Sequence, residues 1–365
     1  MNSKERVLTS LNHEEPDRAP KYLFTTPEVF EKLVKALGID VHEDPYIFDV
    51  ELENDLMLCY RGISNIPGIL REKCKENEKE LLIDNWGIGY KLIHYGKDES
   101  SGSYLEMVSH PLSNIKDYDN FKIPNPYVNE DYIEHKNLVK KYGKEYAIIA
   151  GVATTVFEAS WYLRGLDNLL IDMIENQDFV IDLMKKVADY HLKVAKEMVE
   201  IGADILWLGD DVGMQNSMLI SPEQYRKFLK PIYAYLISEV KKVNKNIKIA
   251  YHTDGYVEPV IKDFIEIGID IYQAVQPSCI NTNELKKKYG KNLAFWGAVD
   301  VQNVMPFGSA GDVINEVRTR ISDLAEGGGY ILCTAHCVQP SIRSVDNIFT
   351  YYWAANRFGK YPIKF

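Results

Sequence analysis

A histidine and a carboxylate stand two residues apart in the stretch AYHTDG, which covers residues 250–255. His252 and Asp254 follow an apolar run, and their spacing puts both side chains on one face of an extended segment. A second histidine, His336, and a cysteine, Cys337, stand together after another apolar run. Nitrogen, oxygen and sulfur donors of this kind suit zinc, so these residues are predicted to provide three or four ligands to a zinc ion that has a position open for substrate.

Each of these residues also has a purely structural interpretation. A histidine at a strand end is often only a hydrogen-bonding residue, and Asp254 before a glycine fits a turn. Cys279 and Cys333 are expected to be buried as small apolar side chains, whereas Cys337 is compatible with either role. Other residues that could complete a metal site are Cys333, Glu51 and Glu53.

More acids and amides follow other apolar runs. The stretch GDDVGMQ contains two carboxylates and an amide, and FWGAVDVQ contains another carboxylate. An acid placed beside a reacting group can take up or deliver a proton during a reaction. Two adjacent acids can instead mark the start of a helix. The candidate catalytic residues are Asp210, Asp211, Gln215 and Asp300.

Aromatic residues are plentiful, with 24 tyrosines and five tryptophans. Most are expected to pack in the core. A minority near the strand ends could form an apolar wall for a flat or methylated ligand. The candidate substrate-binding residues are Trp86, Trp207, Gln276 and Trp296.

The elements that must position these residues are predicted from a weak internal repeat. Residues 200–210, 266–276 and 326–336 align without gaps, and each passes from a glutamate through glycine into an apolar run. Such a unit is typical of a helix that feeds a buried parallel strand. Strands are predicted within these three units and at 18–24, 44–50, 145–152, 245–252 and 292–300. Eight strands alternating with helices indicate a (βα)₈ barrel, in which functional residues lie at the carboxyl ends of the strands.

One region departs from this alternation. Residues 80–110 contain two or three short runs typical of antiparallel strands around a polar turn, GKDESSG. We expect this region to be an insertion that lies over the barrel. No linker-like segment marks a domain boundary, so residues 1–365 are predicted to form a single domain.

Composition excludes several classes of protein. The net charge of −11 argues against a surface that binds nucleic acid, which needs clustered Lys and Arg. No apolar stretch approaches the roughly 20 residues that span a bilayer, and the charged start lacks the apolar segment of a signal peptide. A cytoplasmic protein with small-molecule or protein partners is therefore expected.

Several of these stretches resemble the uroporphyrinogen decarboxylase superfamily, and within it the cobalamin-dependent methyltransferases. The resemblance runs along nearly the whole chain, through SKERVLTSLNHEEPDRAP, DNWG, DDVGMQNSMLISPEQYRKFLKP, HTDG, FWGAVDVQ and GGGYILCTAHCVQPSIRSVDNI. It implies a (βα)₈ barrel. It also implies a zinc ion, held by a His-x-Cys pair and a distant Cys, and a corrinoid on a separate carrier protein.

The chain departs from both better-known branches of that superfamily. Where the decarboxylases carry RQAGRY after the first strand, it reads KYLFTTPEVF, so porphyrinogen decarboxylation is not expected. Where the thiol methyltransferases have His-x-Cys, it has His252-Thr253-Asp254, and His336 replaces a cysteine.

The leading hypothesis is a zinc-dependent transfer of a methyl group from a small O-methylated donor, such as a methoxy-aromatic compound, to a corrinoid protein. Harder ligands leave a metal more electrophilic, which suits an oxygen leaving group. Two alternatives remain open. One is transfer from a methyl-corrinoid to a thiol or another acceptor, and the other is a metal-free binding module.

Overall fold

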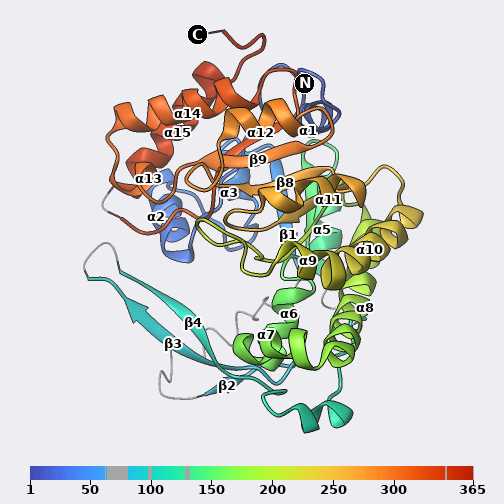
Figure 1. The fold of residues 1–365 in the computed structure, drawn as a ribbon. Coiled ribbons are helices and arrows are strands. Elements are labelled where there is room, and N and C mark those ends of the chain that lie inside the picture. Colours follow the sequence, from blue (N-terminus) through green and yellow to red (C-terminus); the bar gives the residue numbers. More distant parts are fainter. Residues whose placement is uncertain (62, 64–80, 98–100, 128–131, 342, 365) are drawn as a thin grey trace.

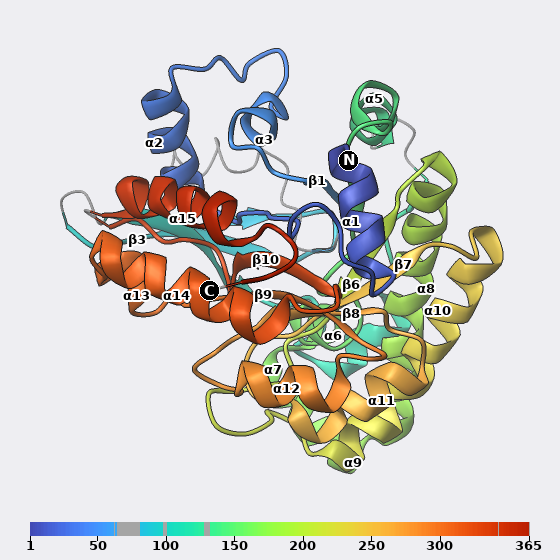
Figure 2. The same cartoon turned by 90° about the horizontal axis from the view of Figure 1, so that it is seen from above.

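The computed structural model describes residues 1–61, 63, 81–97, 101–127, 132–341 and 343–364 (Figure 1). At its centre lies a seven-stranded parallel sheet in the order β1-β5-β6-β7-β8-β9-β10. Its strands are Leu56–Tyr60 (β1), Ala147–Gly151 (β5), Ile205–Gly209 (β6), Lys248–His252 (β7), Ile271–Val275 (β8), Ala294–Val299 (β9) and Tyr330–Thr334 (β10). Neighbouring strands are consecutive along the chain within this sheet, which curls around a common interior and confirms the predicted barrel (Figure 2).

An extended segment closes the ring between β10 and β1. Lys21 bridges Leu332 of β10 in parallel, and on its other side the backbone N–H of Asp55 donates to the carbonyl of Lys21 over 2.9 Å. This segment is the strand predicted at 18–24. It forms isolated bridges instead of a continuous ladder, and Pro20 has no N–H to contribute to one.

The prediction of a strand at 44–50 is wrong. Those residues lead into a short helix, α3 (Ile47–Glu51), and the place in the sheet is taken by β1. A short apolar run does not distinguish a strand from a buried helical turn. The β1 sequence LMLCY, in turn, has none of the β-branched residues that signal a strand.

Helices surround the sheet and alternate with its strands (Figures 1 and 2). They are α1 (Ser3–Leu11), α2 (Pro27–Leu37), α3, α5 (Ile133–Tyr142), α6 (Phe157–Arg164), α7 (Leu166–Glu175), α8 (Gln177–Ile201), α9 (Pro222–Gln224), α10 (Lys230–Val243), α11 (Ile261–Glu266), α12 (Thr282–Tyr289), α13 (Val304–Phe307), α14 (Ala310–Leu324) and α15 (Ser344–Phe358). In the described part of the chain there are also two 3₁₀ turns, η2 (Ile115–Asn120) and η5 (Glu258–Val260), and a π-helical turn, η4 (Tyr225–Leu229). Among the described helices, none has the length and apolar character needed to cross a membrane.

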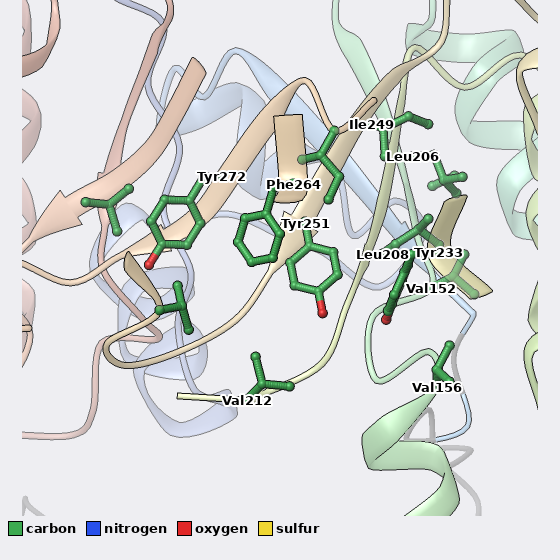
Figure 3. Close-up of a cluster of buried hydrophobic side chains, with 14 of the residues drawn as sticks. Val152, Val156, Leu206, Leu208, Val212, Tyr233, Ile249, Tyr251, Phe264 and Tyr272 are labelled. Carbon is green, nitrogen blue, oxygen red and sulfur yellow. The ribbon is translucent and has the colours of Figure 1, made fainter. Parts of the chain in front are cut away.

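The barrel interior is a packed apolar layer. Val7 and Leu11 of α1 contribute to it from the end where the strands begin, so that α1 covers this end. Trp207 of β6 and Trp296 of β9 fill it toward the other end. A second apolar layer lies between the sheet and the outer helices. Figure 3 shows part of this outer layer, including Leu206, Leu208, Tyr233, Ile249, Tyr251, Phe264 and Tyr272.

The insertion is a separate three-stranded antiparallel sheet, as predicted. Its strands are β2 (Leu82–Ile83), β3 (Gly89–Tyr95) and β4 (Gly102–Ser109). Residues 98–100, in the predicted turn, lie outside the described part of the chain. The Tyr95 hydroxyl lies 3.2 Å from Oε1 of Gln339, which follows β10, and the backbone N–H of Ser103 donates to Glu28 at the start of α2. The insertion therefore reaches the side of the barrel where the strands end.

Candidate functional site

Three side chains at the carboxyl ends of β6 and β7 form a cluster with the composition of a metal site. The two strands are parallel, and Gly209 pairs with His252. Residues that follow the two strands are therefore neighbours. Asp211, His252 and Asp254 each offer one ligand atom, and these three atoms all lie within 4.8 Å of one another. One nitrogen and two oxygens are thus presented at the carboxyl-terminal end of the barrel, where (βα)₈-barrel enzymes have their active sites.

The two loops that carry the cluster approach so closely that they require glycine. The backbone N–H of Asp254 donates to Oδ1 of Asp211 over 2.7 Å. A Cβ on Gly213 would overlap the carbonyl oxygen of Asp254. A Cβ on Gly255, whose φ is +80°, would lie 2.6 Å from the carbonyl oxygen of Met214. The glycine in HTDG therefore has a steric reason, in addition to its turn conformation.

His252 is held on both sides of its ring. Its Nε2 lies 3.5 Å from Oδ1 of Asp211, and its Nδ1 contacts the side-chain oxygen of Gln273. The indole of Trp207 meets the ring edge-on at 5.4 Å. Burial lowers the pKa of His252, but the carboxylates of Asp211 and Asp254 outweigh it, and the pKa is raised above its usual value.

Asp254 has an unused acceptor. Its Oδ1 is buried and has no hydrogen-bond partner among the described residues, and its Oδ2 lies 3.6 Å from Nε2 of His336. Burial raises the pKa of this carboxyl against the opposing effect of His252. Nearby Asp211 acts in the same direction as burial. A buried carboxylate oxygen without a donor, beside another carboxylate, is what a bound cation would relieve. The residues present therefore fit a metal ion.

The other two predicted ligands lie beside the cluster and are not part of it. His336 is linked to it through Asp254 and is partly exposed. Cys337 follows His336, and burial together with the charge of Asp254 raises the pKa of its thiol to about 11. Among the described residues, the cluster contains Asp211, which was predicted from the sequence as a catalytic residue. It contains neither His336 nor Cys337.

Asp210 is fully buried and caps the first turn of α6. Its carboxylate accepts hydrogen bonds from the backbone N–H groups of Val156, Phe157 and Glu158 at 2.8–3.1 Å and from the Tyr233 hydroxyl at 2.6 Å. Burial raises the pKa of Asp210 to about 6. With its oxygens occupied in this way, Asp210 positions a helix. Of the two adjacent acids, Asp211 is the one that belongs to the cluster.

The remaining polar candidates lie on the loops around the cluster. Asp300 accepts from the backbone N–H of Gln302 at 2.6 Å and from that of Asn303 at 3.1 Å, and so shapes the turn before α13. Gln215 is exposed and lies 3.5 Å from Gln302. Gln276 accepts from the backbone N–H of Gly255 at 2.6 Å, which ties the loop after β8 to HTDG. Gln276 therefore supports the loop that carries Asp254.

The aromatic candidates lie at different depths. Trp207 contacts His252, and Phe24 stacks on Trp207 at 5.5 Å and on Trp296 at 5.6 Å. Trp296 is fully buried. Trp86 lies in the insertion, 3% exposed, with its ring against Tyr190 of α8. Trp207 is thus the tryptophan that touches the cluster, and Trp86 packs the insertion onto a helix.

The alternative ligands lie elsewhere. Cys333 is in the barrel interior, where burial raises the pKa of its thiol to about 12. Glu53 pairs with Lys21 at 2.9 Å on the side where β1 begins, and Glu51 ends α3 on the same side. The strand ends that carry the cluster are on the opposite side of the barrel.

Two residues near the cluster were not anticipated from the sequence. Glu158 in the first turn of α6 accepts from the backbone N–H of Asp211 at 3.0 Å, and burial with the nearby charges of Asp211 and Asp210 raises the pKa of Glu158 well above its usual value. Gln273 of β8 contacts both His252 and Trp207. Gln273 lies within a predicted strand, but no spacing pattern marks either residue as functional.

A parallel (βα)₈ barrel with acids and a histidine at the carboxyl ends of its strands has the architecture of a barrel enzyme. More specifically, the chain belongs to the uroporphyrinogen decarboxylase (URO-D) family, whose model matches residues 97–357. This confirms the resemblance noted in the sequence.

Individual proteins similar to this chain include two methanogen enzymes. The methylcobamide:CoM methyltransferase MtbA of Methanosarcina acetivorans is 27% identical over 334 residues, covering 89% of this chain and 90% of that protein. MtbA of Methanosarcina mazei is 27% identical over 246 residues, covering 66% and 67%. A solved methyltransferase from Methanosarcina mazei has the same fold, with a TM-score of 0.70 at 18% identity over 98% of this chain and 99% of that one.

Proposed function

We propose that this protein is a metal-dependent methyltransferase that moves a methyl group between a small molecule and a corrinoid carried by a separate protein. The observation that carries the proposal is the Asp211–His252–Asp254 cluster at the carboxyl ends of β6 and β7. Membership of the URO-D family and similarity to methylcobamide:CoM methyltransferases support the reaction class.

Zinc is the metal we infer. Asp211, His252 and Asp254 would hold it, and three protein ligands leave a fourth position for substrate. When bound there, zinc would supply a Lewis acid beside the oxygen of the donor. Because the cluster of Asp211, His252 and Asp254 contains no thiolate, the site is harder than a zinc site built on cysteines. This favours an oxygen ligand over a sulfur ligand.

The donor that best suits these features is a small O-methylated compound, such as a methoxy-aromatic. Its C–O bond breaks as the methyl group leaves, and the oxygen keeps the electron pair. The rings of Phe24, which is partly exposed, and Trp207, which is 9% exposed, form a stacked apolar surface, and the edge-on contact of Trp207 with His252 connects this surface to the cluster. A flat apolar ring can lie on such a surface.

The proton for the departing oxygen is assigned to His336. Its Nε2 lies 3.6 Å from Asp254 and its side chain is 43% exposed, so it reaches both the cluster and solvent. Asp210, by contrast, already accepts from three backbone N–H groups and a hydroxyl. We therefore give Asp210 a positioning role and His336 the proton transfer.

The first test is the metal content of the purified protein by elemental mass spectrometry. We expect about one zinc per chain, as for a single three-ligand site. The zinc should be lost in Asp211→Ala and His252→Ala and retained in the surface control His42→Ala. A chain without zinc after careful purification, or one in which all three variants keep it, would contradict the proposed site.

The second test is methyl transfer to a reduced corrinoid protein. Methoxy-aromatics, methanol and methylamines are offered in parallel, and the methylated corrinoid is followed by its absorbance. Activity with methoxy-aromatics alone is the expected result. If no donor gives methylated corrinoid, the O-demethylase proposal is wrong. Activity only with methylamines would show that the donor is a methylamine.

A second candidate is transfer in the opposite direction, from a methyl-corrinoid to a thiol or another acceptor. It is favoured by the names of the relatives, which are methylcobamide:CoM methyltransferases. Offering methylated corrinoid protein with coenzyme M or other thiols, and measuring loss of the methyl-corrinoid absorbance, separates this reaction from the first.

A further inference from the structure

A single amide oxygen joins the aromatic surface to the histidine of the cluster. Gln273 is 2% exposed, and its Oε1 lies 3.1 Å from Nε1 of Trp207 and also contacts Nδ1 of His252. Gln273 pairs with His252 in the register of β7 and β8, and Trp207 reaches it from β6. Three neighbouring strands therefore contribute one residue each to this contact.

The chemistry of the indole fixes the direction of both hydrogen bonds. The N–H of Trp207 can only donate, so the atom of Gln273 that faces it must be the oxygen. A carbonyl oxygen has two lone pairs and can accept a second hydrogen bond. The Nδ1 of His252 must then carry a proton and donate it to the same oxygen. In a neutral imidazole this leaves the lone pair on Nε2.

The lone pair is thereby directed at the cluster. Nε2 is the nitrogen that lies 3.5 Å from Oδ1 of Asp211. Without the Gln273 oxygen, the same carboxylate would favour the opposite tautomer, with the proton on Nε2 donated to Asp211. A histidine in that tautomer offers the cluster no lone pair and cannot act as a metal ligand through Nε2.

We propose that Gln273 and Trp207 are positioning residues that set the tautomer of His252 and prepare Nε2 as a ligand. This inference rests on the proposed metal site for its purpose, but the tautomer itself is a property of the metal-free chain. Trp207 thus has a role beyond its ring, because its N–H orients the amide of Gln273.

The test uses the whole protein, labelled with ¹⁵N-histidine and freed of metal. At an alkaline pH, where imidazole is neutral, long-range ¹H–¹⁵N correlation identifies which nitrogen of His252 carries the proton, and His252→Ala assigns the signal. We expect Nδ1–H in the wild type and Nε2–H in Gln273→Met. Gln273→Glu, which keeps an acceptor for both donors, should restore Nδ1–H.

Zinc affinity, measured by competition with a chromophoric chelator, gives a second readout. Gln273→Met should weaken it by about tenfold to a hundredfold, as loss of an outer hydrogen bond to a histidine ligand does. Trp207→Phe should weaken it less, by up to about tenfold, since the amide is then free to turn. Trp296→Phe is the matched control, because Trp296 is also a buried barrel tryptophan but its N–H makes no hydrogen bond to Gln273 or His252. It should leave both the affinity and the tautomer unchanged.

Failure of this inference can be distinguished from failure of the metal site. If the wild type binds no zinc but shows the Nδ1–H tautomer, and Gln273→Met reverses it, the metal proposal falls and the positioning role stands. An Nε2–H tautomer in the wild type, or an unchanged tautomer in Gln273→Met, overturns the positioning role whatever the zinc affinity.

Discussion

Asp211 accepts a hydrogen bond from the backbone N–H of Asp254 while its carboxylate also faces His252. The same oxygen, Oδ1, makes both contacts. One side chain therefore holds the loop after β7 in place and belongs to the group of candidate ligands. This double role makes Asp211 the most informative residue for separating loop structure from metal binding.

Asp211→Asn should lose metal affinity while keeping the loop. The amide oxygen still accepts from Asp254, but the negative charge that attracts a cation is gone. We expect zinc affinity to fall by roughly a hundredfold or more, beyond the loss typical of an outer-layer change. Titration calorimetry with zinc measures this, and the melting temperature of the metal-free protein should stay within a few degrees. A variant that binds zinc like the wild type would remove Asp211 from the ligand set.

Gly255→Ala should disturb both the loop and the site. The backbone there has φ +80°, and the added methyl would lie 2.6 Å from the carbonyl oxygen of Met214. The left-handed conformation alone costs about 1 to 2 kcal/mol. Gly38→Ala is the control, because Gly38 has φ +66° and an added methyl there would meet nothing within 4 Å. Urea unfolding should show a larger loss for Gly255→Ala than for Gly38→Ala, and equal losses would show that the loop yields without cost.

Asp55→Ala should be strongly destabilising. Asp55 is fully buried and pairs with Arg6 and Arg18 at 2.7 Å each, and its Oδ2 accepts from the backbone N–H of Lys21. Removing it takes the shared buried carboxylate away from Arg18 and from Nη1 of Arg6, which keeps its pair with Asp17, where the closing segment meets β1. Such losses cost about 3 to 5 kcal/mol. Lys287→Ala, which breaks an exposed pair with Glu284, should cost less than about 1 kcal/mol. Denaturant unfolding measures both, and a small loss in Asp55→Ala would contradict this role.

Asp49 should make the protein less stable as the pH rises. Burial raises the pKa of this carboxyl to about 7, against the hydrogen bond from Asn54. Between about pH 4 and pH 7 the folded state therefore holds a proton that the unfolded state has released, so stability falls with rising pH across this window and is level above it. The loss of stability across this window is at most about 4 kcal/mol.

Asp49→Asn checks this dependence. The amide keeps an acceptor for Asn54 but carries no charge. The variant should match the wild type near pH 4 and be more stable at pH 8, as measured by thermal unfolding at both values. Glu51→Gln, an exposed change on the same helix, should leave the difference between the two pH values as in the wild type. If Asp49→Asn gains nothing at pH 8, the buried carboxyl is already stabilised in its charged form.

The barrel was predictable because buried parallel strands leave a strong local pattern. The runs that become β5, β6, β8, β9 and β10 are buried along their whole length, and β7 is buried except at its two ends. The prediction failed at 44–50, where a short apolar run serves equally for a helical turn. It also missed β1, whose LMLCY sequence has weak strand preference. The insertion at 80–110 was recognised by its short strand-like runs around a polar turn.

By itself, the amino-acid sequence determined which strand ends carry acids and histidines, since each lies directly after an apolar run. It placed His252 and Asp254 on one face of one strand end, because that relationship spans only two residues. Only the tertiary structure decided that Asp211 completes the group and that Asp210 caps α6. It likewise placed Gln273 against His252. These relationships join residues far apart in the chain, and they depend on strand register and barrel curvature, which no local pattern encodes.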